Sequence, residues 1–227
     1  MRHKIIVSLD GVSVKEALNI ASKLKNKVWG FKVNDLLFEP NIIRKLKKFG
    51  KVFADAKLYD IPSTVARSVA RLKKAGADLI TVHASGGVEM MKAALRQAQG
   101  KTKILGVTVL TSEKSANKKA FLKLITNVEK AKLDGIVCSA HELKYLNNSK
   151  LLKVVPGIRP KWFTMSSSKR HDKRDPSRRA LVKANDQSRT TTPREAIKLG
   201  ADLLVIGRPI IKSPNQPEAL EKILSEF

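Results

Sequence analysis

The sequence contains little cysteine, few aromatic residues and no long apolar run. One cysteine among 227 residues cannot form an intramolecular disulfide, which is typical of a protein from a reducing compartment. Apolar runs such as Ile5–Val7 and Leu203–Ile206 are far shorter than the roughly 20 residues that cross a bilayer. The first of these runs ends before Asp10, so it is too short for a secretory signal. We therefore expect a soluble cytoplasmic protein with no membrane partner.

Acidic side chains are also scarce, because 20 of them face 45 lysines and arginines and leave a net charge of +25. The 12 glycines and 9 prolines are too few for a collagenous or low-complexity chain. Such a charge favours anionic substrates or polyanionic partners. No aromatic residues are interleaved with the basic ones as a base-stacking platform would require, so we interpret most of the charge as solvated surface.

Short apolar, β-branched runs alternate with amphipathic stretches along the whole chain. The expected strands are Ile5–Leu9, Val28–Val33, Val52–Lys57, Leu79–His83, Ile104–Val109, Gly135–Cys138, Leu152–Val155 and Leu203–Ile206. The stretches between them carry apolar residues at helical spacing, as at Val65, Val69 and Leu72. Eight such units predict an α/β fold, a (β/α)8 TIM barrel formed by residues 1–227 as a single domain. An open doubly wound sheet is the alternative, although no glycine-rich fingerprint follows the first strand.

Charged side chains stand at the carboxyl ends of the first three expected strands. Asp10 follows the first strand, Lys32 lies near the end of the second, and Asp55 and Lys57 end the third. Residues two apart on a strand share one face, roughly 7 Å apart along the backbone. Because these ends meet at the mouth of a barrel, we expect Lys32, Asp55, Lys57 and the following Asp60 to converge there.

The residues 55–64 resemble the signature of the orotidine 5′-phosphate decarboxylase family. Related phosphosugar decarboxylases and synthases share its first half, Asp-x-Lys-x-x-Asp, whereas the following Ile-Pro-x-Thr points to the orotidylate branch. Other matching segments cover the chain in the family's order: Ser8-Leu9-Asp10, Phe31-Lys32-Val33, Val82-His83-Ala84-Ser85-Gly86-Gly87, Val109-Leu110-Thr111-Ser112, Pro156-Gly157-Ile158-Arg159-Pro160, Asp186-Gln187 and Ile206-Gly207-Arg208-Pro209-Ile210. Asn34 stands where the family usually has glycine, and we expect it to alter the local turn.

The resemblance implies decarboxylation of orotidine 5′-phosphate to UMP in pyrimidine biosynthesis, with no metal ion and no cofactor. Lys57 matches the residue that protonates C6 of the pyrimidine, and flanking carboxylates at Asp55 and Asp60 would keep its amine charged. Lys32 would balance Asp55 and, with Asp10, contact the ribose. The residues that match Asp60 and Thr64 reach into the neighbouring subunit's site in the family, which implies a homodimer with shared active sites.

The resemblance also implies the remaining substrate contacts. The loops after the seventh and eighth strands of such barrels often bind phosphate, which independently points to the arginines there. The pyrimidine would contact residues after the fifth strand. The substrate-binding residues, besides Asp10, are thus Ile61, Thr64, Thr111, Ser112, Arg159, Gln187, Gly207 and Arg208.

A basic insertion at about 161–185 departs from the family pattern. The 25 residues between Pro160 and Asp186, where the family has only a few, include eight basic and two acidic side chains. We expect a partly disordered excursion that leaves Gln187 usable, with an extended lid or a docking segment as alternatives. Two other functions stay open: a metal-dependent phosphosugar decarboxylase, and a nucleic-acid-binding protein that uses this segment, although we consider nucleic acid an unlikely partner.

Overall fold

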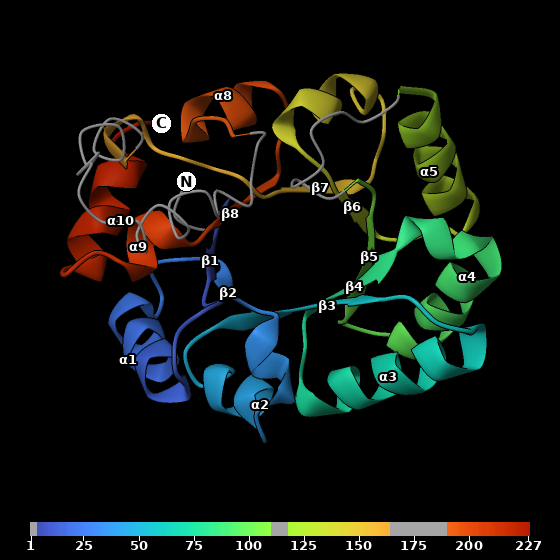
Figure 1. Cartoon of the computed structure of the whole chain (residues 1–227), viewed down its shortest axis with the longest axis horizontal. Helices are drawn as coiled ribbons and strands as arrows, with labels where there is room; N and C mark the ends of the chain where they lie inside the picture. The colour runs from blue at the N-terminus through green and yellow to red at the C-terminus, as the bar shows by residue number, and fades with distance from the viewer. Residues whose placement is uncertain (1–3, 110–117, 164–189) are drawn as a thin grey trace, which may run out of the picture.

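The structure, a computed structural model, describes residues 4–109, 118–163 and 190–227. Within these ranges, parallel strands form a closed barrel in the order β1 to β8, with β8 paired to β1 (Figure 1). The strands are β1 Ile5–Ser8, β2 Gly30–Val33, β3 Lys51–Leu58, β4 Leu79–His83, β5 Lys103–Val107, β6 Gly135–Val137, β7 Leu152–Val155 and β8 Leu203–Ile206. The predicted TIM barrel is therefore confirmed, and each predicted strand is present with ends shifted by at most two residues.

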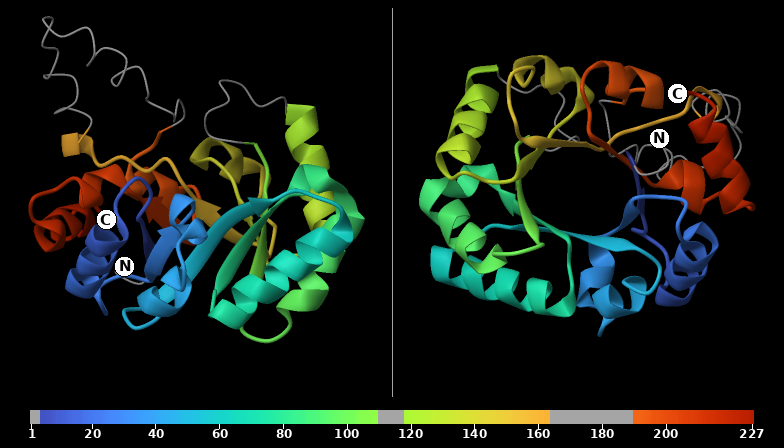
Figure 2. Two further views of the ribbon diagram at one scale, coloured as in Figure 1. Left: turned by 60° about the horizontal axis from the view of Figure 1, so that its bottom comes forward. Right: turned by 180° about the vertical axis from the view of Figure 1, so that it is seen from behind.

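Helices surround the barrel as an outer ring, which the right view of Figure 2 shows. The α-helices are α1 Val14–Leu24, α2 Ile42–Leu46, α3 Pro62–Ala75, α4 Gly87–Ala98, α5 Lys118–Lys130, α8 Pro193–Lys198, α9 Arg208–Ile211 and α10 Gln216–Leu224. Among the described residues, 3-10 helices follow the ends of β2, β4 and β6: η2 Asp35–Phe38, η3 Ala84–Gly86 and η4 Ala140–Tyr145. In the described ranges, none of these helices has the length and apolar character required to cross a membrane.

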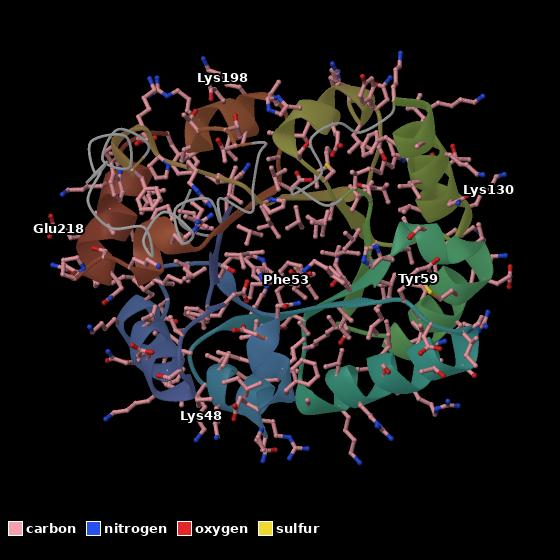
Figure 3. All side chains as sticks on the ribbon, in the orientation of Figure 1. Lys48, Phe53, Tyr59, Lys130, Lys198 and Glu218 are labelled. Atoms are coloured by element: carbon pink, nitrogen blue, oxygen red, sulfur yellow. The ribbon has the colours of Figure 1, made fainter. Side chains whose placement is uncertain are left out.

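The core has two parts because successive side chains of a strand point to opposite faces. The larger part packs between the strands and the helices and includes Val7, Ile80 and Ile104. The smaller part contains Ile6, Phe53 and Leu105, and Figure 3 places Phe53 at the centre of the barrel. The barrel interior is thus filled with side chains, and a ligand can enter only at an end.

At the amino end of the barrel, an aspartate precedes β4, β6 and β8 and links each of these strands to the strand before it. Each precedes its strand, and its Oδ2 accepts a hydrogen bond from a backbone N–H of the preceding strand. The pairs are Asp78 with Val52 at 2.7 Å, Asp134 with Ile104 at 2.8 Å and Asp202 with Lys153 at 2.8 Å. A carboxylate that accepts a backbone N–H forms a strong hydrogen bond, so this end of the barrel is built for stability.

Removal of one of these carboxylates should therefore weaken the fold. Asp134→Ala should lower the free energy of unfolding by about 1–3 kcal/mol, because the Ile104 N–H loses its acceptor. Asp134→Asn keeps an acceptor oxygen and should lose less. Urea unfolding of both variants measures the difference, and an Ala variant as stable as wild type would contradict this role.

Candidate active site

A cavity of about 430 Å³ opens at the carboxyl ends of the strands. Its volume lies within the range of small-molecule sites, which is roughly 300–1,000 Å³. Apolar side chains such as Val107, Val137 and Pro156 line one part of it. Seven of the residues predicted to form the site also line it: Asp10, Lys32, Asp55, Lys57, Arg159, Gly207 and Arg208.

Four of these side chains form a chain of alternating charge. Lys57 Nζ donates a hydrogen bond to Asp55 Oδ2 at 2.6 Å, and Lys32 Nζ lies 3.2 Å from the same oxygen. Lys32 Nζ also forms an ion pair with Asp10 Oδ2. Lys32 and Asp55 are each only 7% exposed, so their charges depend on one another for stabilisation.

The neighbouring charges determine the protonation states of the two buried members. Burial alone would lower the pKa of Lys32, but the carboxylates of Asp55 and Asp10 outweigh it and raise that pKa. Burial alone would raise the pKa of Asp55, but Lys32, Lys57 and a hydrogen bond from Thr81 lower it. Both side chains are therefore charged at neutral pH.

Strand β3 is irregular where it carries Asp55 and Lys57. Ala54 pairs with Ile80 and Leu58 pairs with Val82, so β3 advances four residues while β4 advances two. Lys57 has a φ of +45°, in the left-handed region. The predicted contact between the two charged side chains is present, but regular strand alternation is not its cause. A bulge in β3 brings them together.

Polar groups on the neighbouring strands hold the charged side chains in place. Ser8 Oγ donates to Asp10 Oδ2 at 2.7 Å, and the Asn34 N–H donates to Asp10 Oδ1 at 3.1 Å. Asn34 Nδ2 donates to the backbone oxygen of Asp55 at 2.6 Å, which joins the ends of β2 and β3. The φ of Asn34 is −123°, so this position does not need the glycine usual in the family. Its side chain does more than alter the turn, because it supports Asp55.

Asp60 lies apart from this cluster within one chain. It is exposed, and its Oδ1 accepts the backbone N–H of Ile61 at 2.6 Å. Ile61 is also exposed, and Thr64 is half-buried and accepts a hydrogen bond from Arg67 Nη2 at 3.1 Å. Neither Asp60, Ile61 nor Thr64 lines the cavity. The expectation that all four charges converge is therefore met by Lys32, Asp55 and Lys57 and not by Asp60 of the same chain.

Two arginines lie at the part of the cavity formed after β7 and β8. Arg159 is 9% exposed, and burial together with the charge of Arg208 lowers its pKa to about 10. Arg159 is fixed through its backbone, because its N–H donates to the Thr191 oxygen at 2.9 Å and the Thr191 N–H donates to Gly157 at 3.2 Å. Two like charges beside one cavity favour an anionic ligand, which would relieve their repulsion.

Some of the predicted site residues lie outside the described residues. These are Thr111, Ser112, Gln187 and most of the basic insertion at about 161–185. Among the residues that the structure describes, no group of three or more His, Cys, Asp or Glu side chains is arranged to hold a metal ion. Thr81 is the functional candidate that sequence reasoning missed, and its only signal was a hydroxyl in the apolar strand β4.

Comparisons with known proteins show the family of this chain and support its fold. A model of the orotidine 5′-phosphate decarboxylase / HUMPS family matches residues 3–223. The orotidine 5′-phosphate decarboxylase of Carboxydothermus hydrogenoformans is 39% identical over 252 residues, which cover 100% of this chain and 97% of that protein. That of Wigglesworthia glossinidia brevipalpis is 39% identical over 245 residues, 98% of this chain and 97% of that protein. The crystal structure of the Lactobacillus acidophilus enzyme has a TM-score of 0.76 at 29% identity and covers 99% of each chain.

The arginine pair should bind inorganic phosphate in the absence of any other ligand. Arg159→Gln and Arg208→Gln should each weaken phosphate binding about tenfold or more, because a hydrogen bond to a charged group contributes about 1.5–3 kcal/mol. Calorimetric titration measures the affinity. Lys222→Gln removes the same charge from the exposed surface of α10 and is the matched control. Equal losses in all three variants would mean that net charge alone attracts the anion.

Proposed function

The chain belongs to the orotidine 5′-phosphate decarboxylase / HUMPS family, and we propose that it converts orotidine 5′-phosphate to UMP without a metal ion or cofactor. The observation that carries this proposal is the Asp10–Lys32–Asp55–Lys57 chain, whose two central members are buried, in a cavity that also contains Arg159 and Arg208. The lysines and aspartates suit a reaction that creates negative charge on a carbon atom. The two arginines suit the binding of a phosphate group.

In the proposed reaction, the bond between C6 and the carboxylate breaks and CO2 leaves. The electron pair stays on C6, where the Lys57 ammonium stabilises it and then transfers a proton to it. The Lys57 side chain is 32% exposed, so the amine can recover a proton from water. The contact between Lys57 Nζ and Asp55 Oδ2 at 2.6 Å holds the amine in place for this step.

Asp55 would lie near the substrate carboxylate in this arrangement. Repulsion between two carboxylates is one way to raise the energy of the bound substrate, but that mechanism is contested. Stabilisation of the developing carbanion by charges already in position is the account we propose instead. Lys32 and Asp10 would contact the ribose, and their mutual ion pair supports a fixed geometry for that contact.

The phosphate would bind to Arg159, Gly207 and Arg208 together with Gln187, and Thr111 and Ser112 would contact the pyrimidine. Binding energy from a phosphate remote from C6 can be used to hold the reacting carbon against Lys57. The Ile61-Pro62-Ser63-Thr64 segment argues against the metal-dependent phosphosugar alternative. A cytoplasmic location agrees with a sequence that has a single cysteine, the buried Cys138.

We also propose a homodimer in which Asp60, with Ile61 and Thr64, completes the site of the partner subunit. Asp60 is exposed and uses its carboxylate on the adjacent backbone, so it does not serve the cavity of its own chain. The large apolar side chains beside it and on η2 are also exposed: Tyr59 by 65%, Ile61 by 63% and Phe38 by 94%. Exposed apolar side chains at the mouth of the barrel are typical of an interface.

Purified protein should produce UMP from orotidine 5′-phosphate in the presence of EDTA. Lys57→Ala should lower the rate by at least about 10²–10⁴-fold, because the variant lacks the proton donor. The loss of absorbance on decarboxylation measures the rate. Folded wild-type protein that is inactive with EDTA but active with Mg²⁺ on a sugar phosphate would favour the phosphosugar alternative.

A mixing experiment tests the shared sites. Lys57→Ala and Asp60→Ala should each be inactive alone, but exchange of subunits should restore about a quarter of the wild-type activity. Random exchange makes half of the dimers hybrids, and each hybrid has one intact site of two. The control mixes Lys57→Ala with Asp55→Ala, whose residues belong to the same site, and should recover nothing. Equal recovery in both mixtures would contradict the shared site.

A further inference from the structure

Thr81 is a fully buried polar residue in the middle of an otherwise apolar strand. It lies in β4 between Ile80 and Val82, and all three are 0% exposed. Thr81 is not among the described residues that line the cavity. Its hydroxyl group instead faces the bulge of β3, where the register between the two strands shifts.

The Thr81 hydroxyl makes two hydrogen bonds to strand β3, which carries Asp55 and Lys57. It accepts the backbone N–H of Lys57 at 2.9 Å and donates to Asp55 Oδ1 at 2.9 Å. A hydroxyl can do both at once, whereas a backbone carbonyl can only accept. Thr81 therefore gives the Lys57 N–H an acceptor in place of the backbone carbonyl of a regular strand pair, and it binds the Asp55 carboxylate at the same time.

The bulge needs this support because it contains strained backbone. A non-glycine residue in the left-handed region, such as Lys57, costs of order 1–3 kcal/mol and persists only when its surroundings hold it. Thr81 also occupies one oxygen of Asp55, which leaves Oδ2 for Lys57 Nζ at 2.6 Å and Lys32 Nζ at 3.2 Å. Without the hydroxyl, the half-buried Lys57 N–H and the buried Asp55 Oδ1 would each lose this hydrogen bond.

We propose that Thr81 is a positioning residue, which fixes the backbone of Lys57 and the carboxylate of Asp55 so that the lysine ammonium meets the reacting carbon. The proposal rests on the proposed decarboxylation and adds to it a residue that is not among those lining the cavity. Its effect should appear in the chemical step and leave substrate binding almost unchanged.

The protonation of Asp55 provides a second way to observe this role. Its pKa is lowered against the effect of burial, first by Lys32 and Lys57 and then by hydrogen bonds that include the one from Thr81. The charged and titratable groups around it lie on strands β2 to β4 or directly after β1: Lys32, Lys57, His83 and Asp10. A variant without the Thr81 hydroxyl keeps all of these charges, so a shift in the Asp55 pKa would report the hydroxyl itself.

The first experiment compares Thr81→Val, which keeps the shape of the side chain, with Thr81→Ser, which keeps the hydroxyl. We expect Thr81→Val to lower kcat by about 10–100-fold, since a small misplacement of reacting groups can cost about 100-fold. KM should change little, and Thr81→Ser should retain most of kcat. Thr102→Val is the matched control, because it removes a threonine hydroxyl that donates to Ala77 at 2.8 Å at the other end of the barrel.

An equal loss of kcat in Thr81→Val and Thr81→Ser, or no loss in Thr81→Val, would overturn the proposal. A loss of thermal stability alone, similar in Thr81→Val and Thr102→Val, would also overturn it. If Thr81→Val does not fold, Thr81→Ala removes the hydroxyl with less crowding and has the same expected outcome.

The second experiment does not depend on activity. Carbon-13 NMR of the Asp55 carboxyl should show a higher pKa in Thr81→Val than in wild type, because the hydrogen bond favours the charged form. The shift should be absent in Thr81→Ser. An unchanged Asp55 pKa in Thr81→Val would contradict the positioning role. If wild-type protein lacked decarboxylase activity, the proposed function would fail, and this titration would still test the role of Thr81 in the cluster.

Discussion

The structure depends on one buried carboxylate that serves two lysines. Asp55 cannot be charged at 7% exposure without Lys32 and Lys57, and Lys32 is held in turn by Asp10. This requirement accounts for the irregular features around it. The bulge in β3 places Lys57, and the Asn34 amide binds the Asp55 backbone. Each of these features is local, but all of them help to hold the ionised side chains of Asp55 and Lys57 in place.

The two ends of the barrel have different physical tasks. At the amino end, Asp78, Asp134 and Asp202 accept backbone N–H groups and strengthen the junctions between strands. At the carboxyl end, charged side chains are gathered at a cavity and the backbone is strained at Lys57. A closed barrel allows this division because its stability comes from the ladder, the packed interior and one end, which leaves the other end free for chemistry.

The sequence predicted the barrel and most of the charged cluster, because both follow from periodic patterns. Alternating strands and helices have few ways to pair, and the ends of parallel strands meet, so Lys32, Asp55 and Lys57 could be placed together. The bulge and Thr81 could not be predicted. A threonine is an ordinary strand residue, and only the register of two neighbouring strands reveals that its hydroxyl faces a carboxylate. Asp60 was assigned from its motif, and a single chain leaves it on the surface.

The backbone hydrogen bonds of Thr191 to Arg159 and Gly157 have a consequence for how this protein can change during evolution. The two hydrogen bonds bring together positions that are 32 residues apart in the sequence and tie the backbone of Gly157 and Arg159 to Thr191. Doubling the length of a closed loop costs only about 0.6 kcal/mol in entropy. The length of the chain between these two anchors can therefore change over evolution at a small cost to the stability of the barrel, because the backbone of Arg159 stays bound to Thr191.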